Sequence, residues 1–278
     1  MKTLSLANKV AIKHYLQTGN YDPNDRNWPG QNFIEVETNA DQAMREALIT
    51  EVNKRTPIQV QVPIPERGDL VALTRAKVTP MVNGLFPLIE RPAVMKVLEK
   101  SVIFLTPENI ESTLRASTWL HTTWNLANMY LLQRGAKPLS PKAPTILGLS
   151  EETSCYLSLD YLDEQSNDPF SDYLVHEAAH VFHNCRRSAV GFQETRTRHA
   201  LLNIDFPKRE TFAYACEAYS RLLMMADSAS NRRNALARHA EGPLPNEDVV
   251  DRREYLDILA EAVVARNGWK RILHACRP

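Results

Sequence analysis

Two histidines and a glutamate in one short segment have the types and spacing to do chemistry. His176, Glu177 and His180 form the pattern His-Glu-x-x-His in a segment that is predicted to be helical. Residues four apart lie one above the other on the same face of a helix, so both imidazoles can reach one ion. Imidazole nitrogen suits zinc, and Glu177 is placed to take a proton from a water molecule held there. The sequence therefore predicts a zinc site that activates water for attack on a carbonyl carbon.

The composition around this pattern favours a functional site over an accidental match. With eight histidines in 278 residues, we expect roughly 0.02 matches to the pattern by chance. The two variable positions are Ala178 and Ala179, and their neighbours in residues 174–182 are largely uncharged. A helix buried beside a metal needs such neighbours, because a charged side chain there would be desolvated at high cost. The alternative is a surface helix whose two histidines have ordinary hydrogen-bond partners.

The segment 173–182 resembles the active-site helix of the zincin superfamily of metallopeptidases. Zincins place a small sheet ahead of this helix, and two strands are predicted between residues 145 and 162. In the family, the edge strand of that sheet holds extended substrate by main-chain pairing. The resemblance implies an α+β, mostly helical fold, a Zn²⁺ cofactor and a protein or peptide substrate.

The third metal ligand separates the zincin subclasses. Metzincins need Gly and His soon after the second histidine, and residues 184–186 are Asn, Cys and Arg, so we reject that subclass. Glu210 opens a predicted helix 30 residues after His180. Its Glu-x-x-Ala segment resembles the glutamate helix of the gluzincins, where alanine permits close packing against the histidine helix. We therefore expect His176, His180 and Glu210 as the metal ligands and Glu177 as the catalytic base.

Other residues near the pattern have alternative roles. Glu217 lies two turns after Glu210 on the same helical face and is an alternative third ligand, although we prefer a solvated or supporting carboxylate. The loop residues Glu194 and His199 are further alternatives. His183 adds another turn of histidine, but three histidines on one straight helix do not all reach one tetrahedral ion, so we expect it to line the site.

The oxyanion formed during attack needs a donor in addition to the metal. The sequence offers four candidates without choosing among them, and a tyrosine buried in the core is the commoner case. These candidates are Tyr214, Tyr219, His199 and Arg221.

Helical periodicity dominates the elements that must position these residues. A helix over 106–133 is predicted to begin with Thr106 as its cap and Pro107 in its first turn, and to carry Trp119 and Trp124 toward the core. The His-Glu-x-x-His helix is predicted to start between Asp168 and Ser171. Further helices are predicted at 4–16, 41–54, 92–100, 168–186, 210–227, 249–266 and 269–276. Strands are predicted at 58–64, 102–105, 145–149 and 154–162.

Three prolines within residues 135–144 mark a predicted boundary. This divides the chain into residues 1–140, mainly helical and of unknown role, and residues 141–278, the zincin-like domain. Lys+Arg and Asp+Glu both total 33, so the basic excess of a nucleic-acid-binding protein is missing. No apolar run could cross a membrane, and Lys9 and Lys13 interrupt any signal-like stretch. The four cysteines contain no Cys-x-x-Cys pair, which indicates reduced thiols in the cytoplasm.

The leading interpretation is a zinc-dependent metallopeptidase or related amide hydrolase. The alternative is a zincin-fold regulatory or binding protein that has a metal site but no broad peptidase turnover. A helical protein without a metal is a third interpretation.

Overall fold

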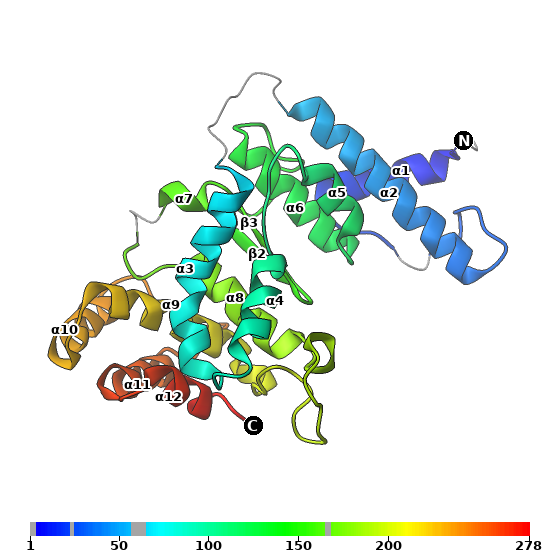
Figure 1. Cartoon of the computed structure of the whole chain (residues 1–278). Coiled ribbons are helices and arrows are strands. Elements are labelled where there is room, and N and C mark those ends of the chain that lie inside the picture. The colour runs from blue at the N-terminus through cyan, green and yellow to red at the C-terminus, as the bar shows by residue number, and fades with distance from the viewer. Residues whose placement is uncertain (1–3, 23–24, 57–64, 165–167) are drawn as a thin grey trace. The chain divides into compact units, whose positions relative to one another are not determined.

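The computed structural model describes residues 4–22, 25–56, 65–164 and 168–278. They form two compact units, each made of two stretches of the chain (Figure 1). The first unit contains residues 1–64 and 105–147, and the second contains residues 65–104 and 148–278. The sequence predicted one boundary near residue 140. The two units do not follow that boundary, because residues 65–104 pack with residues 148–278. The strand predicted at 58–64 lies outside the described residues.

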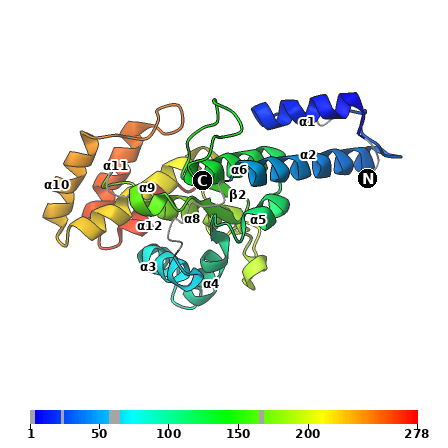
Figure 2. The same cartoon turned by 90° about the horizontal axis from the view of Figure 1, so that it is seen from above.

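Four helices make up the described part of the first unit. They are α1 (Leu6–Thr18), α2 (Phe33–Arg55), α5 (Ile110–Ala116) and α6 (Leu120–Gln133). Helix α2 packs along α6, and α1 runs beside α2, as Figure 2 shows. Trp124 is buried, as expected, whereas the side chain of Trp119 is exposed.

The single helix predicted over 106–133 is wrong, because the chain breaks between α5 and α6. The buried guanidinium of Arg45 donates hydrogen bonds to the carbonyl oxygen of Leu114 and to the hydroxyls of Ser117 and Thr123. Helix α5 begins only at Ile110, whose N–H donates to the Thr106 carbonyl oxygen. The hydrogen bonds from Arg45, which lies on α2, satisfy polar groups that an interrupted helix leaves unpaired, so the break is stable.

The second unit combines a three-stranded sheet with the remaining helices, which confirms an α+β, mainly helical fold. The strands are β1 (Val102–Phe104), β2 (Gly148–Glu151) and β3 (Ser154–Leu157). The helices are α3 (Arg67–Leu85), α4 (Arg91–Ser101), α7 (Tyr161–Glu164), α8 (Tyr173–Asn184), α9 (Arg209–Met225), α10 (Ala229–Ala240), α11 (Arg252–Val264) and α12 (Gly268–Ala275). Helices α3, α7 and α10 were not predicted. No described helix is both long and apolar enough to cross a membrane.

The sheet has the order β1-β3-β2, so β2 lies at an edge. Strand β1 runs parallel to β3, and Ile103 pairs with Tyr156. Strands β2 and β3 form an antiparallel hairpin in which Leu149 pairs with the same tyrosine. Glu152 occupies the turn with a φ of 50°. The two strands predicted ahead of the His-Glu-x-x-His helix are confirmed, but β2 begins three residues later than the predicted 145–149, and β3 ends at Leu157 within the predicted 154–162.

Helix α8 starts at Tyr173, later than predicted, because the buried Asp172 caps it. The Asp172 carboxylate accepts the Val175 N–H and also the phenol of Tyr161 at 2.6 Å. Lys77 of α3 forms a 2.6 Å ion pair with the same carboxylate. A cap with these additional partners fixes the start of the helix and therefore the direction in which its histidines point. Helix α8 packs against α9 and the hairpin, and Phe182 on its far side contacts Phe86.

Candidate metal centre

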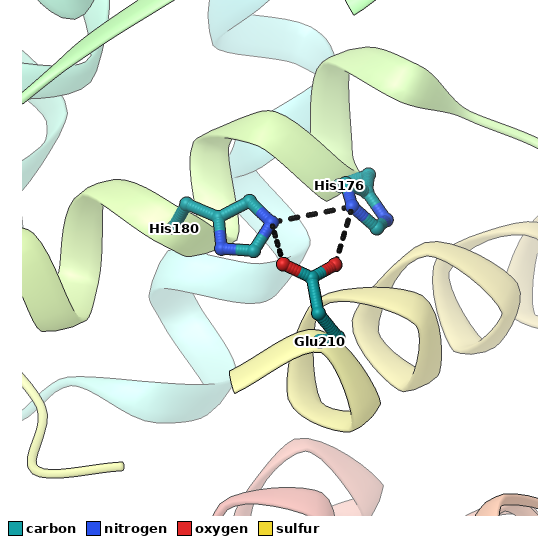
Figure 3. Close-up of side chains that lie close together, drawn as sticks. All are labelled: His176, His180 and Glu210. Atoms are coloured by element: carbon teal, nitrogen blue, oxygen red, sulfur yellow. Dashed lines mark hydrogen bonds and ion pairs between the residues drawn. The ribbon is translucent and has the colours of Figure 1, made fainter. Parts of the chain in front are cut away.

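Three predicted ligands from two helices converge on one point. His176 and His180 lie one turn apart on α8, and Glu210 comes from the first turn of α9 (Figure 3). The two Nε2 atoms of the histidines are 3.2 Å apart. The Glu210 carboxylate faces both rings, with 3.6 Å from Oε2 to His176 Nε2 and 3.6 Å from Oε1 to His180 Nε2. The structure thus brings together the three residues expected as ligands.

The spacing of these three donors fits a divalent metal. A tetrahedral ion with bonds of about 2.0–2.2 Å places its ligand atoms roughly 3.3–3.6 Å apart. The three observed separations are 3.2, 3.6 and 3.6 Å. Both histidines are buried, whereas the Glu210 side chain is 41% exposed. The cluster is therefore enclosed by protein on the histidine side and accessible on the Glu210 side.

Glu217 supports His176 from behind and does not join the three-donor cluster. Its Oε2 lies 3.1 Å from His176 Nδ1, the ring nitrogen that faces away from Glu210. Its Oε1 accepts the Ser171 hydroxyl at 3.0 Å and the Asp172 N–H at 2.7 Å. When the ring is neutral, a carboxylate at Nδ1 keeps the ring proton on that nitrogen and leaves the Nε2 lone pair facing the cluster. This geometry agrees with the preferred interpretation of Glu217 as a supporting carboxylate.

His183 makes an equivalent contact behind the second histidine. Its Nε2 lies 3.4 Å from His180 Nδ1, and its ring is 5.2 Å from the ring of His180. Its Nδ1 is buried without a hydrogen-bond partner in the described part of the chain. Burial lowers the pKa of His183 to about 3, so the ring stays neutral and its Nε2 can accept a hydrogen bond from His180 Nδ1–H. His183 therefore lies next to the predicted ligand His180 and outside the three-donor cluster.

Glu177 is a buried carboxylate between α8 and the edge strand β2. A Cβ atom added at Gly148 would lie 2.9 Å from Glu177 Cγ and 3.0 Å from its Oε1, so the strand approaches this side chain closely. Ser150 on the same strand forms a hydrogen bond with the carboxylate. Burial raises the pKa of Glu177 to about 7, against the opposing effects of His176 and Ser150. A carboxylate with a pKa near neutrality can both accept and release a proton.

The charges around the two histidines favour one positive charge at the cluster. Burial alone would lower the pKa of His176, but its hydrogen bonds to Glu210 and Glu217 outweigh burial and raise that pKa to about 10. Burial, together with the charge of His176, lowers the pKa of His180 to about 4. The hydrogen bond with His176 lowers the pKa of Glu210. The two carboxylates therefore create a site that attracts a cation.

Of the four candidate oxyanion donors, the structure brings only Tyr214 against a predicted ligand. Its ring lies 4.4 Å from the ring of His176, one helical turn after Glu210. Tyr219 is instead buried against Trp269. The remaining candidates are engaged elsewhere: His199 with the Arg196 carbonyl oxygen and Arg221 with that of Pro169.

The loop alternatives for the third ligand lie apart from the described cluster. Glu194 accepts hydrogen bonds from the hydroxyl and N–H of Ser188, and the side chain of His199 is exposed. Sequence reasoning did not identify the Lys77–Asp172 ion pair, because the two residues are 95 positions apart. The role of Gly148 was also missed, although a glycine at the start of a predicted strand is a signal of close approach.

Comparison of the chain with models of known protein families, with curated proteins and with solved structures finds no match.

Proposed function

We propose that the chain is a zinc-dependent metallopeptidase whose metal is held by His176, His180 and Glu210. The observation that carries the proposal is the convergence of two Nε2 atoms and one carboxylate, at tetrahedral spacing, beside the buried carboxylate of Glu177. Two imidazoles and one carboxylate are the ligand set of catalytic zinc in several hydrolases, and they leave a fourth position for water. The resemblance to gluzincins, with a glutamate on a later helix, points to the same ligands.

The proposed chemistry is hydrolysis of a peptide bond by an activated water. Zinc, when bound, polarises the substrate carbonyl and acidifies water. Glu177 accepts a proton from the attacking water and then passes it to the leaving amine. Glu217 and His183 hold the two histidine rings in the tautomer that presents Nε2 to the cluster.

Tyr214 is the proposed donor to the oxyanion. Burial raises the pKa of its phenol to about 12, so the hydroxyl keeps its proton at neutral pH and can donate a hydrogen bond. Its ring already contacts His176. No other candidate donor named above contacts a predicted ligand within the described residues.

Strand β2 is the proposed support for an extended substrate. Within the described residues it pairs with β3 on one side only, and Gly148 brings it against Glu177. Main-chain groups at a sheet edge can pair with an added peptide strand. We therefore expect a protein or peptide substrate. The four cysteines are free and buried, which supports our expectation of a cytoplasmic protein.

Removal and return of zinc tests this function. We expect a chelator to abolish cleavage of a mixed peptide library by the purified chain, and one equivalent of zinc to restore it, because water activation depends on the metal. Cleavage is followed by mass spectrometry of the peptide termini. Cleavage that persists in fully metal-free protein would contradict the proposal. Tight zinc binding without any cleavage would favour the alternative, a zincin-like binding protein.

A further inference from the structure

A basic groove of about 990 Å³ lies in the second unit, separate from the three predicted ligands. One wall is α12 with the residues after it, another is the loop 197–203, and the end of α3 contributes Leu85. None of the described residues that line it has a carboxylate side chain. The groove therefore has one sign of side-chain charge, although the whole chain has a formal net charge of zero.

Exposed cationic side chains surround this basic groove. Lys270 comes from α12, Arg277 from the residues after that helix, and Arg198 from the loop. Within the described part of the chain, no ion pair engages Lys270, Arg277 or Arg198. Arg271, beside them, has only an exposed contact of 3.8 Å with Glu261. These charges are consequently available to an anionic partner.

Three nearly buried leucines are among the residues that line the basic groove, and we call them its floor. They are Leu201, Leu202 and Leu273. The Leu201 N–H donates to the Cys185 carbonyl oxygen at 2.9 Å, and the Leu202 N–H donates to that of Phe182 at 2.8 Å. The loop is thus tied to the end of α8. A groove that already has its shape loses little conformational entropy when it binds a partner.

We propose that the basic groove binds an acidic peptide segment of a partner protein, with leucine-type side chains on its floor and carboxylates at its rim. Cations around an apolar floor complement a peptide that alternates acidic and apolar residues. A single-stranded nucleic acid fits less well, because such sites stack bases mainly on large aromatic rings and the described lining contains no Phe, Tyr or Trp. This binding requires no metal, so it is independent of the proposed peptidase activity.

Fluorescence anisotropy with a labelled peptide tests the proposal on the full chain. The probe is a fluorescein-labelled peptide of about twelve glutamate and leucine residues, and its reference replaces each glutamate by lysine. The test variant is Lys270→Glu/Arg277→Glu, in which Lys270 lies in the first turn of α12 where an acidic residue is favourable. The control is Lys96→Glu/Lys100→Glu, two exposed lysines one turn apart on α4 that give the same change in net charge. Mass spectrometry verifies that the probe stays intact.

We expect the wild-type chain to bind the acidic probe and not the lysine reference. We expect the test variant to weaken this binding by about tenfold or more, and the control variant to change it less than about threefold. Equal effects of the two variants would overturn the proposal, as would equal binding of the two peptides. Tighter binding of a labelled oligo(dT), lost in the same test variant, would assign the groove to nucleic acid instead and would also overturn it.

Discussion

The Glu177→Gln variant is expected to hydrolyse peptides about 10²- to 10⁴-fold more slowly than the wild-type chain while it retains its zinc. The substitution keeps the size of the side chain and one acceptor oxygen but removes the carboxylate that accepts a proton. Because Glu177 is buried beside Gly148, glutamine occupies the same space without opening the site. Rates are measured on zinc-loaded protein against a peptide library, and bound zinc is quantified in the same samples.

The control for this variant is Glu241→Gln, an exposed glutamate after α10 to which no catalytic role is assigned. We expect this control to retain the wild-type rate. Undiminished hydrolysis by Glu177→Gln would remove that residue from the mechanism. A loss of zinc together with activity would show that its role is structural.

Replacing Glu210 by alanine is expected to weaken zinc binding by at least about 10²-fold. Loss of a residue that only supports a ligand typically weakens metal binding by about 10- to 100-fold, and Glu210 is a proposed direct ligand. The variant leaves the two imidazoles without an anionic partner at 3.6 Å. The Glu210 side chain is partly exposed, so its truncation leaves little empty space in the core. Affinity is measured by competition with a chromophoric chelator.

The control is Glu194→Ala, which removes a carboxylate of the loop after α8 that bonds to Ser188. We expect Glu194→Ala to bind zinc as the wild-type chain does. Unchanged zinc affinity in Glu210→Ala would assign the third ligand to another residue.

The two histidines of the three-donor cluster were predictable because their spacing within one short segment places them together. The pattern His-Glu-x-x-His places two imidazoles on one helical face from sequence spacing alone, and α8 has the expected helical form. Glu210 required the further expectation that a later helix packs against the first. Helix α9 does pack against α8, and the small residues Ala178 of α8 and Ala213 of α9 are fully buried.

The features that the sequence did not predict depend on contacts between distant residues. The break between α5 and α6 is stabilised by Arg45, whose hydrogen-bond partners at the break lie 69 to 78 positions away. The start of α8 depends on the ion pair between Lys77 and Asp172, since this pair and the Tyr161 phenol stabilise the cap. Helix α3 contains Pro80, which argues against a helix when local propensity is considered alone. Periodicity does not reveal such pairings, because each side chain looks like an ordinary surface residue within its own segment.

An anomalous difference map from crystals soaked in zinc tests the central claim most directly. We predict one strong peak, within about 2.0–2.2 Å of the Nε2 atoms of His176 and His180 and of a carboxylate oxygen of Glu210. A map in which zinc is absent from this cluster, or in which the two imidazoles have turned away from each other, would contradict the account.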